Sequence, residues 1–339
     1  MKTQSEVNIM ATLTLERCTP EFITSLRQCG MDSVRINSAH VTPDELRFMV
    51  KTIRDIDPAI KILMDTKGAE IRTTAVAAPA TFATGDKVTI KYGIELSSRQ
   101  IIYVNCQGID TCKGYGTKVL IDDGDIQLKI TGVDGKGIHA EVTEGGVLDS
   151  RKTVALPGTL LPDMPAVSDN DRLCIEAACE AGIDMIAHSF VRSADDVRQV
   201  RALLEGTGIT LYSKIECGEA VERMDDILAV SDGLLVARGD LGTAVPLWMI
   251  PVIQHKVVSL CRRDDKPVIV STQILQSMLN APEPTRAEVS DIALAVMEGT
   301  DTLLLCGETA VGLYPQRCVE IMRKTIDSVC AGGLRCVIR

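Results

Sequence analysis

The stretch from Leu211 to Gly242 reads LYSKIECGEAVERMDDILAVSDGLLVARGDLG. A short apolar segment ends near Lys214 and Glu216, a helical run follows, and a second apolar segment ends just before Asp240. This order predicts a strand, a helix and a strand, with charged residues at the carboxyl end of each strand. Ligands of α/β folds bind at that end of a parallel sheet. The lysine and the two carboxylates therefore predict a site for a divalent metal and an anionic substrate, because Mg²⁺ prefers carboxylate oxygens.

Length, composition and charge narrow the class of protein. The 339 residues suffice for one large α/β barrel or for a barrel with a smaller domain, and 45% of them are apolar. The net charge of −10 argues against a nucleic-acid partner, and no apolar run approaches the roughly 20 residues that cross a membrane. The N-terminal MKTQSEVNIM lacks the apolar core of a signal peptide. Twelve cysteines without a C-x-x-C pair favour reduced thiols, so we expect a cytoplasmic protein.

Eight short apolar segments, each followed by a helical run, predict an α/β fold of the (β/α)8 TIM barrel type. We expect the strands at residues 7–13, 32–37, 60–65, 183–189, 209–216, 232–238, 267–272 and 301–306. Thr42 with Glu45, and Ser168 with Asp171, are typical helix-capping pairs. A doubly wound open sheet is the alternative architecture.

Between residues 74 and 156 the helical spacing of apolar residues is absent. Short segments in which apolar and polar residues alternate are separated there by turn signals such as Asp134-Gly135. This pattern predicts a small all-β domain inserted after the third strand. We expect a catalytic barrel formed by residues 1–73 and 157–339, and a β-barrel-like lid formed by residues 74–156.

Polar side chains follow the predicted strands, and in a barrel they converge on one mouth. They are Arg35, Asn37, His40, Asp65, Thr66, Lys67, Glu70, Arg72, Ser189, Arg192, Lys214, Glu216, Arg238, Gly239, Asp240, Thr272, Gln273 and Glu308. Burying Lys214, Glu216 and Asp240 together is costly without a ligand or a metal. Such a cluster suits a phosphate bridged to the protein by metal, because phosphoryl transfer depends on positioning and on cancelling charge. Buried structural ion pairs are the alternative interpretation of Arg238 and Glu308.

Longer motifs resemble those of the pyruvate kinase family. Asp65–Arg72, DTKGAEIR, is similar to the family's DTKGPEIR, Arg35–His40, RINSAH, to RxNFSH, and Lys152–Gly158, KTVALPG, to KGVNLPG. Five shorter matches are Ser189–Arg192, Lys214–Glu216, Ala237–Gly242, Thr285–Glu288 and Gly307–Ala310. The resemblance runs from about Val7 to Ser328. It implies a barrel with a mobile β domain after the third strand, and a glycolytic phosphotransferase that converts phosphoenolpyruvate and ADP to pyruvate and ATP.

The resemblance also implies roles in the substrate and metal sites. Glu216 and Asp240 would hold Mg²⁺ or Mn²⁺, and Lys214 would contact the transferring phosphoryl group. Thr272 would lie near the enolate carbon, where it helps a water to protonate that carbon. Thr272 would also receive the pyruvate carboxylate, together with the amides around Gly239 and Asp240.

Contacts to phosphates and to a monovalent cation complete the implied site. Arg35 would contact the phosphate of phosphoenolpyruvate and would join Lys214 and Thr272 in the catalytic set. The implied nucleotide contacts are Arg72, Lys152 and His40. The implied ligands of K⁺ are Asn37, Asp65 and Thr66.

Several departures from the family motifs bear on function. Ala39 stands where RxNFSH has a serine that binds the monovalent cation, so we expect weakened K⁺ binding. Residues 13–18, LTLERC, replace the family's IGPAS loop beside the nucleotide base, and Cys306 replaces the serine of SGET. The resemblance also leads us to expect a short form without the family's C-terminal effector domain.

Two other functions fit the same residues. One is a non-enzymatic paralogue that binds phosphoenolpyruvate or metal as a sensor or partner, and calorimetry showing binding without turnover would favour it. The other is an enzyme of altered specificity that acts on another phosphoryl acceptor or on a 2-oxo acid. In each case we expect a homo-oligomer, a dimer formed through the barrel helices.

Overall fold

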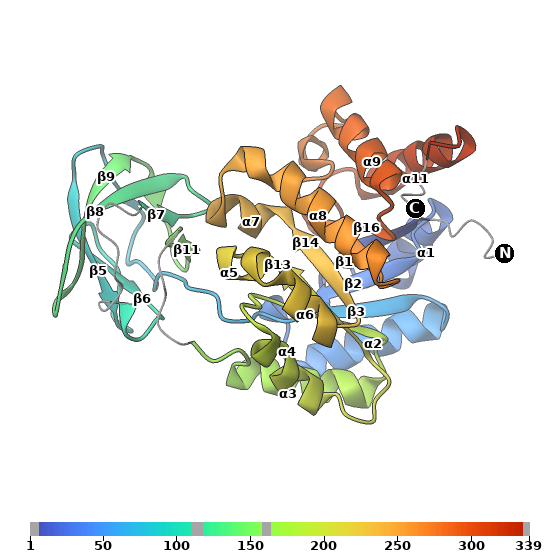
Figure 1. The fold of residues 1–339 in the computed structure, drawn as a ribbon, viewed down its shortest axis with the longest axis horizontal. Coiled ribbons are helices and arrows are strands. Elements are labelled where there is room, and N and C mark those ends of the chain that lie inside the picture. The colour runs from blue at the N-terminus through green and yellow to red at the C-terminus, as the bar shows by residue number, and fades with distance from the viewer. Residues whose placement is uncertain (1–6, 110–117, 158–163, 335–339) are drawn as a thin grey trace. The chain divides into compact units, whose positions relative to one another are not determined.

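The structure is a computed structural model that describes residues 7–109, 118–157 and 164–334. Eight parallel strands close into a barrel in the order β1-β16-β15-β14-β13-β12-β3-β2. Figure 1 labels several of these strands, among them β1, β2 and β3. Their bounds are β1 Asn8–Leu13, β2 Ser33–Asn37, β3 Lys61–Asp65, β12 Met185–His188, β13 Thr210–Ile215, β14 Gly233–Ala237, β15 Val268–Ser271 and β16 Thr302–Leu305. Every predicted segment contains one of these strands. Because the sheet closes on itself, the predicted (β/α)8 TIM barrel is confirmed and the alternative of an open sheet is wrong.

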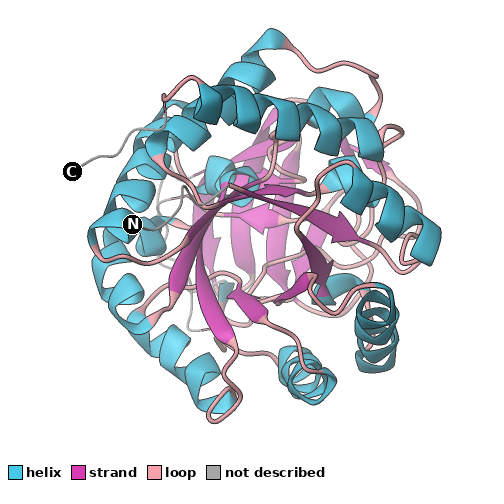
Figure 2. Cartoon of the chain, turned by 90° about the vertical axis from the view of Figure 1, so that its right-hand side faces the viewer, coloured by secondary structure: helices cyan, strands magenta, loops and turns pink. Residues whose placement is uncertain are grey.

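Helices surround the barrel strands (Figure 2). The longer ones are α1 Pro20–Gln28, α2 Pro43–Ile56, α3 Asp169–Ala181, α4 Ala194–Leu203, α8 Ile250–Arg263, α9 Arg286–Glu298 and α11 Pro315–Ala331. The shorter ones are η1 Ser38–His40, α5 Gly218–Glu222, α6 Met224–Val230, α7 Arg238–Ala244, η3 Leu247–Met249, η4 Gln276–Leu279 and α10 Gly307–Ala310. Both predicted capping pairs are confirmed, because Thr42 Oγ1 accepts from the Glu45 amide at 3.3 Å and Ser168 Oγ from the Asp171 amide at 3.1 Å.

A layer of apolar side chains fills the barrel. Its buried members are Met10, Leu63, Ala187, Tyr212, Leu235, Ala237, Ile269 and Leu304. Strands of a parallel sheet that is covered by helices are buried on both faces, and every residue of β14 is buried accordingly. Because the interior is packed rather than open, the polar groups gather at the residues that end or follow the strands.

A second compact unit consists of residues 69–166 together with residues 239–247. Its described strands form a six-stranded sheet in the order β11-β7-β8-β9-β5-β6 and a two-stranded sheet of β10 and β4. The bounds are β4 Ala80–Thr81, β5 Lys87–Tyr92, β6 Ile101–Val104, β7 Lys118–Ile121, β8 Ile126–Asp134, β9 Gly137–Glu144, β10 Val147–Leu148 and β11 Val154–Ala155. Within these described strands β6 and β11 do not pair, so the larger sheet is open where we expected a barrel-like closure.

The compact units divide after residue 68 and after residue 166, several residues outside the predicted limits of 74–156. Packing explains the difference. Ile71 is buried in the core of the second unit, and Met164 packs against that same core. These two residues belong to the β unit because they pack against its core. The alternation of apolar and polar residues in the sequence does not indicate this. The functional division into a catalytic barrel and a lid stays a prediction.

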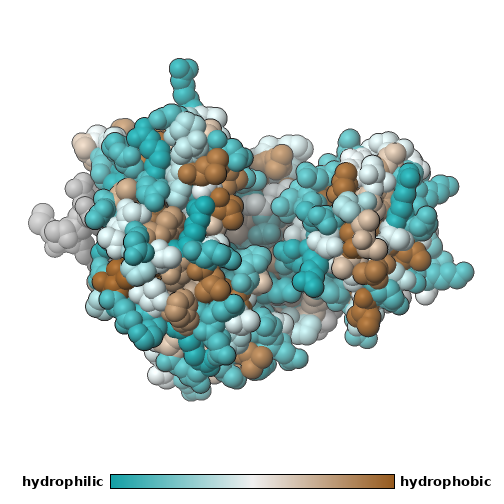
Figure 3. Space-filling view, turned by 180° about the vertical axis from the view of Figure 1, so that it is seen from behind, coloured by the Kyte–Doolittle hydropathy of each residue, from teal (hydrophilic) through white to brown (hydrophobic). Residues whose placement is uncertain are grey.

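Polar side chains cover much of the face seen in Figure 3, with apolar residues scattered between them. Among the described residues, the most exposed large apolar side chains are Ile94 and Trp248. Scattered exposed apolar residues are normal in folded domains. Across residues 7–109, 118–157 and 164–334, each helix is too short or too polar to span a bilayer.

Candidate active site

Lys214 lies in a buried cluster of charges at the ends of three neighbouring strands. Its Nζ lies 3.0 Å from Glu216 Oε2 and 3.3 Å from Asp65 Oδ1, and it donates a hydrogen bond of 2.8 Å to Ser189 Oγ. Asp65 ends β3, Ser189 follows β12, and β12 pairs with both β3 and β13. The strand order therefore brings Asp65 and Ser189 to Lys214 and Glu216, although these three parts of the chain are far apart in the sequence.

Arg35 balances the charge of this cluster. Its Nε and Nη2 donate to Asp65 Oδ2 at 2.8 and 2.5 Å, and Ser189 Oγ donates to Asp65 Oδ1 at 2.9 Å. Burial raises the pKa of Asp65, but Lys214 and Arg35 outweigh it and hold this pKa below its usual value. Arg35 and Lys214 face Asp65 and Glu216, so two cations meet two carboxylates. A phosphate that enters adds negative charge to this balanced cluster, which favours a metal ion entering with it.

The carboxylate of Glu216 is oriented by a strained backbone amide. Phe190 N donates to Glu216 Oε1 at 2.5 Å. Phe190 has a φ of 53°, in the left-handed region that non-glycine residues adopt only at a cost. Sequence reasoning identified the motif that contains Phe190 but missed this amide, because a phenylalanine gives no signal of a left-handed conformation.

The two predicted metal ligands, Glu216 and Asp240, are carboxylates, the type of donor that a hard divalent cation prefers. Asp240 is half-buried and follows Arg238 and Gly239 directly in the chain, at the start of α7. Among the described residues, no three His, Cys, Asp or Glu side chains are grouped to hold a metal. Mg²⁺ does not need such a group, because it keeps several waters and binds one or two carboxylates together with substrate phosphates. The assignment of the metal to Glu216 and Asp240 stays a prediction.

Thr272 lies in the turn that follows β15, again in a left-handed conformation, with a φ of 66°. The side chain is half-buried, and its Oγ1 donates to the Ser271 carbonyl at 2.6 Å. The Thr272 carbonyl accepts hydrogen bonds from Arg238, which is paired with Asp291 at 2.7 Å. The alternative of a structural ion pair therefore applies to Arg238.

Glu308 also has a structural role. It is 1% exposed, and its two oxygens accept from the amides of Leu275 and Cys306 at 3.0 and 2.9 Å. These bonds join the loop after β15 to the end of β16. Glu308 therefore shapes the rim of the barrel.

The predicted K⁺ ligands lie on adjacent strands. Asn37 and Asp65 are register partners on β2 and β3, and Thr66 follows directly. Ala39 is exposed, and its amide donates to Asn37 Oδ1 at 3.0 Å. Ser38 is 1% exposed, and its hydroxyl has no hydrogen-bond partner among the described residues. Ser38 and Ala39 therefore differ in environment, because the Ser38 hydroxyl is buried and Ala39 is exposed.

The predicted nucleotide contacts include two cations of the second unit that are already paired. Arg72 Nε lies 2.6 Å from Glu70 Oε2, and Lys152 Nζ lies 2.7 Å from Asp122 Oδ2. The hydrogen bond that Lys152 donates to Asp122 raises the pKa of Lys152. His40 is exposed at the end of η1 in the barrel. A nucleotide phosphate that binds Arg72 and Lys152 must compete with these carboxylates. Gly158, the last residue of the lysine motif, lies outside the described residues.

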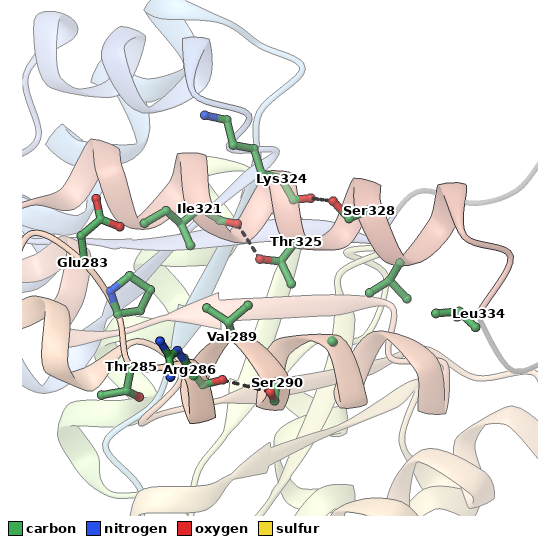
Figure 4. Close-up of a pocket in the computed structure, with 13 residues that line it drawn as sticks. Glu283, Thr285, Arg286, Val289, Ser290, Ile321, Lys324, Thr325, Ser328 and Leu334 are labelled. Atoms are coloured by element: carbon green, nitrogen blue, oxygen red, sulfur yellow. Dashed lines mark hydrogen bonds between the residues drawn. The ribbon is translucent and has the colours of Figure 1, made fainter.

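A groove of about 750 Å³ lies between α9 and α11 (Figure 4). The predicted site residues, which all fall in the described ranges, do not line it. Three hydroxyls of its walls donate to carbonyls of their own helices, Ser290 to Arg286, Thr325 to Ile321 and Ser328 to Lys324. These hydroxyls therefore have hydrogen-bond partners within their own helices. The groove is not the predicted site, because its lining contains none of the predicted residues. A second hollow of about 430 Å³, between α4 and α6, also lies away from the predicted residues.

His188 is a buried histidine that the sequence did not single out. Its neighbour Ala187 faces the barrel interior, so the alternation of a strand places His188 on the helix side of β12. Both ring nitrogens lack a hydrogen-bond partner among the described residues. Burial lowers the pKa of His188 to about 4, against the opposing effect of the Asp196 and Asp171 charges. The imidazole is therefore neutral at neutral pH.

This burial predicts an acid-sensitive stability. An unfolded histidine has a pKa of about 6.5. Between that pH and about pH 4, residue 188 therefore binds a proton in the unfolded chain but stays neutral in the folded chain. The free energy of unfolding should fall by about 2 kcal/mol between pH 7 and pH 5 through His188, as measured by urea unfolding. His188→Leu should remove this loss, whereas His255→Ala, at an exposed histidine, should retain it. An equal pH dependence in His188→Leu and the wild type would refute the assignment.

The fold and the charge cluster define a class: barrel enzymes that bind anionic substrates at the carboxyl ends of their strands. A family model described as "Pyruvate kinase, barrel domain" matches residues 4–319. Relatives named pyruvate kinase include that of Borreliella burgdorferi, 37% identical over 324 residues, which cover 95% of this chain and 68% of the relative. That of Methylorubrum extorquens is 37% identical over 334 residues, 97% and 70% of the two chains. That of Sporosarcina psychrophila is 39% identical over 313 residues, 89% and 53%.

The chain therefore belongs to the pyruvate kinase family. It spans between 53% and 70% of the length of these three curated relatives. The resemblance drawn from the motifs is confirmed.

Proposed function

We propose that this chain transfers the phosphoryl group of phosphoenolpyruvate to ADP, giving pyruvate and ATP. The observation that carries the proposal is Lys214, whose ammonium is held between Asp65 and Glu216 at the ends of the barrel strands. Most of the catalysis of phosphoryl transfer is positioning and cancellation of charge. A buried, rigidly paired lysine supplies both. The relatives named pyruvate kinase support this choice of reaction.

Three residues of the barrel have separate roles in this reaction, set by their charge and position. Lys214 offsets the charge of the phosphoryl group as the bond to the enolate oxygen breaks and a bond to the β-phosphate of ADP forms. Arg35, fixed by Asp65 at 2.8 Å, orients the phosphate. Thr272, next to the enolate carbon, helps solvent to deliver the proton that turns the enolate into pyruvate.

Two kinds of cation complete the proposal. Mg²⁺ or Mn²⁺, held by Glu216 and Asp240, supplies the positive charge that the balanced cluster lacks and neutralises the phosphate. K⁺ would bind at Asn37, Asp65 and Thr66 with one ligand fewer than in the family, because Ala39 has no side-chain oxygen. Arg72, Lys152 and His40 would contact the nucleotide.

A turnover assay with and without K⁺ tests this proposal. Pure protein with Mg²⁺, phosphoenolpyruvate and ADP should form pyruvate, and half-maximal activation by K⁺ should lie above the low millimolar range. The matched variant Ala39→Ser restores the hydroxyl and should lower the K⁺ concentration needed. Isothermal titration of K⁺ should show the same order of affinities without relying on activity.

Two outcomes would contradict it separately. Absence of pyruvate at saturating substrates, metal and K⁺ would overturn the proposed reaction. Activation of the wild type at low millimolar K⁺, equal to that of Ala39→Ser, would leave the reaction standing and refute the weakened cation site.

We also infer a homodimer formed through the barrel helices and a cytoplasmic location. All ten described cysteines carry free thiols, as expected in a reducing compartment. Trp248, exposed in η3 just before α8, is of the residue type that dimer contacts favour.

A further inference from the structure

The guanidinium of Arg238 binds the backbone of the turn that carries Thr272. Its Nε and Nη2 donate to the Thr272 carbonyl at 3.2 and 2.9 Å, and Nη2 also donates to the Gln273 carbonyl at 3.1 Å. The planar fork of an arginine presents these donors in a fixed geometry. One side chain therefore fixes the direction of two successive carbonyl groups.

Both of those residues adopt a conformation that they would otherwise avoid. Thr272 has a φ of 66° and Gln273 a φ of 52°. A β-branched residue at positive φ is a genuine outlier, and such strain persists only where the surroundings impose it. The fork of Arg238 binds both carbonyls, so it helps to hold the turn in this conformation.

Arg238 is itself anchored from the helix layer. Nη1 donates to Asp291 Oδ1 and Oδ2 at 2.9 and 2.7 Å, and it lies 3.4 Å from Gln254 Oε1. Gln254 in turn donates to Glu298 Oε2 at 2.9 Å. Arg238 and Gln254 are 7% and 3% exposed, so water has little access to the guanidinium. Arg238, Gln254 and Asp291, which we call the anchor, join α8 and α9 to the turn after β15.

We propose that Arg238 and Asp291 are positioning residues for the protonation of the enolate, acting through Thr272. The proposal rests on the proposed function. In that step the enolate carbon gains a proton from solvent, and the electrons of the enolate oxygen form the carbonyl of pyruvate. Arg238 and Asp291 touch neither substrate nor metal in this scheme. They hold the backbone from which the Thr272 hydroxyl reaches the reacting carbon.

The test separates protonation from substrate binding in variants of the anchor. Asp291→Asn keeps the shape and loses the charge, and Arg238→Lys keeps the charge and loses the fork. Exchange of pyruvate methyl protons with D₂O, followed by NMR with Mg²⁺, K⁺ and ATP, should slow by about 10- to 100-fold in both. The KM for phosphoenolpyruvate should change little. Combining Asp291→Asn with Thr272→Ala should cost no more than Thr272→Ala alone, as expected for residues that act as one unit.

A matched control removes a similar ion pair elsewhere in the barrel. Asp184 lies before β12 and binds Arg54 at 2.7 Å, so Asp184→Asn reports the effect of losing a structural pair. It should leave methyl exchange close to that of the wild type. Thermal unfolding of each variant identifies any that fail to fold, in which case the other anchor variant carries the test.

Amide hydrogen exchange measured by mass spectrometry supplies a readout that does not need activity. Residues 271–275 should exchange faster in Asp291→Asn and Arg238→Lys than in Asp184→Asn. Unchanged methyl exchange in the anchor variants, an equal loss in Asp184→Asn, or additive losses with Thr272→Ala would each overturn the proposal. If the wild type itself makes no pyruvate and exchanges no methyl protons, the proposed function fails. In that case the amide hydrogen exchange of residues 271–275 is the measurement that shows whether Arg238 holds the turn.

Discussion

Lys214→Met should lower kcat for pyruvate formation by about 10²- to 10³-fold, the loss typical of removing one preorganised charge from a transition state. Methionine has nearly the length of lysine, so the change removes the ammonium and leaves the volume. The Nζ that lies 3.0 Å from Glu216 and 3.3 Å from Asp65 would then be absent, and the cluster would carry an excess negative charge. That charge repels the phosphate, so KM should rise as well. A steady-state assay at saturating Mg²⁺ measures both constants.

Lys266→Met is the matched control for this variant. Lys266 is half-buried, and its Nζ donates to the carbonyls of Leu228 and Ser231 at 2.6 and 2.7 Å. Losing it should reduce stability and leave kcat nearly unchanged. If Lys214→Met is folded and retains wild-type kcat, the ammonium does not act on the phosphoryl group.

The largest expected effect on stability is that of Asp65→Ala. Asp65 is 2% exposed and faces both Arg35 and Lys214. Removing it leaves the buried Lys214 and the half-buried Arg35 with too little negative charge. Breaking a buried pair in this way costs about 3–5 kcal/mol. Urea unfolding at pH 7 measures the loss. Asp44→Ala, which removes an exposed partner of Arg47, should cost little, because surface pairs contribute about 0–1 kcal/mol.

The pH dependence of the Asp65 contribution has a definite sign. Its folded pKa is held below the usual aspartate value, against burial, by Lys214 and Arg35. The stabilisation is therefore complete above the unfolded pKa of about 3.9 and is lost as the pH falls through the folded pKa. The difference between wild type and Asp65→Ala should stay constant from pH 7 to pH 5 and shrink below pH 4. A difference that shrinks already between pH 7 and pH 5 would contradict this account.

The charge balance of the cluster links these two predictions. Arg35 and Lys214 face Asp65 and Glu216, so removing either kind of partner leaves an unmatched charge in a buried place. Loss of the lysine acts mainly on the incoming phosphate, and loss of the aspartate mainly on folding. The same balance explains why a divalent metal suits this reaction, since Asp65 and Glu216 already face the positive charges of Arg35 and Lys214.

Local patterns were enough to predict the elements of the barrel. Each predicted strand contains an observed one, because strands buried on both faces form short apolar segments that end at polar residues. Helix starts at Thr42 and Ser168 were equally visible, because capping depends on residues three positions apart. The limits of the inserted unit were less visible, because Ile71 and Met164 join its core by packing and leave no mark on the local pattern.

By itself, the sequence determined the barrel, the β insertion, the family and the residues that end the strands, because all of these follow from hydrophobic periodicity and from the order of motifs. Only the tertiary structure decided which charges meet. Asp65, Ser189 and Lys214 come from three strands, and the register of β3, β12 and β13 sets their distances. The left-handed turns at Phe190 and Thr272 were likewise decided by tertiary contacts. A non-glycine side chain does not encode a positive φ, which is held instead by distant partners such as Arg238.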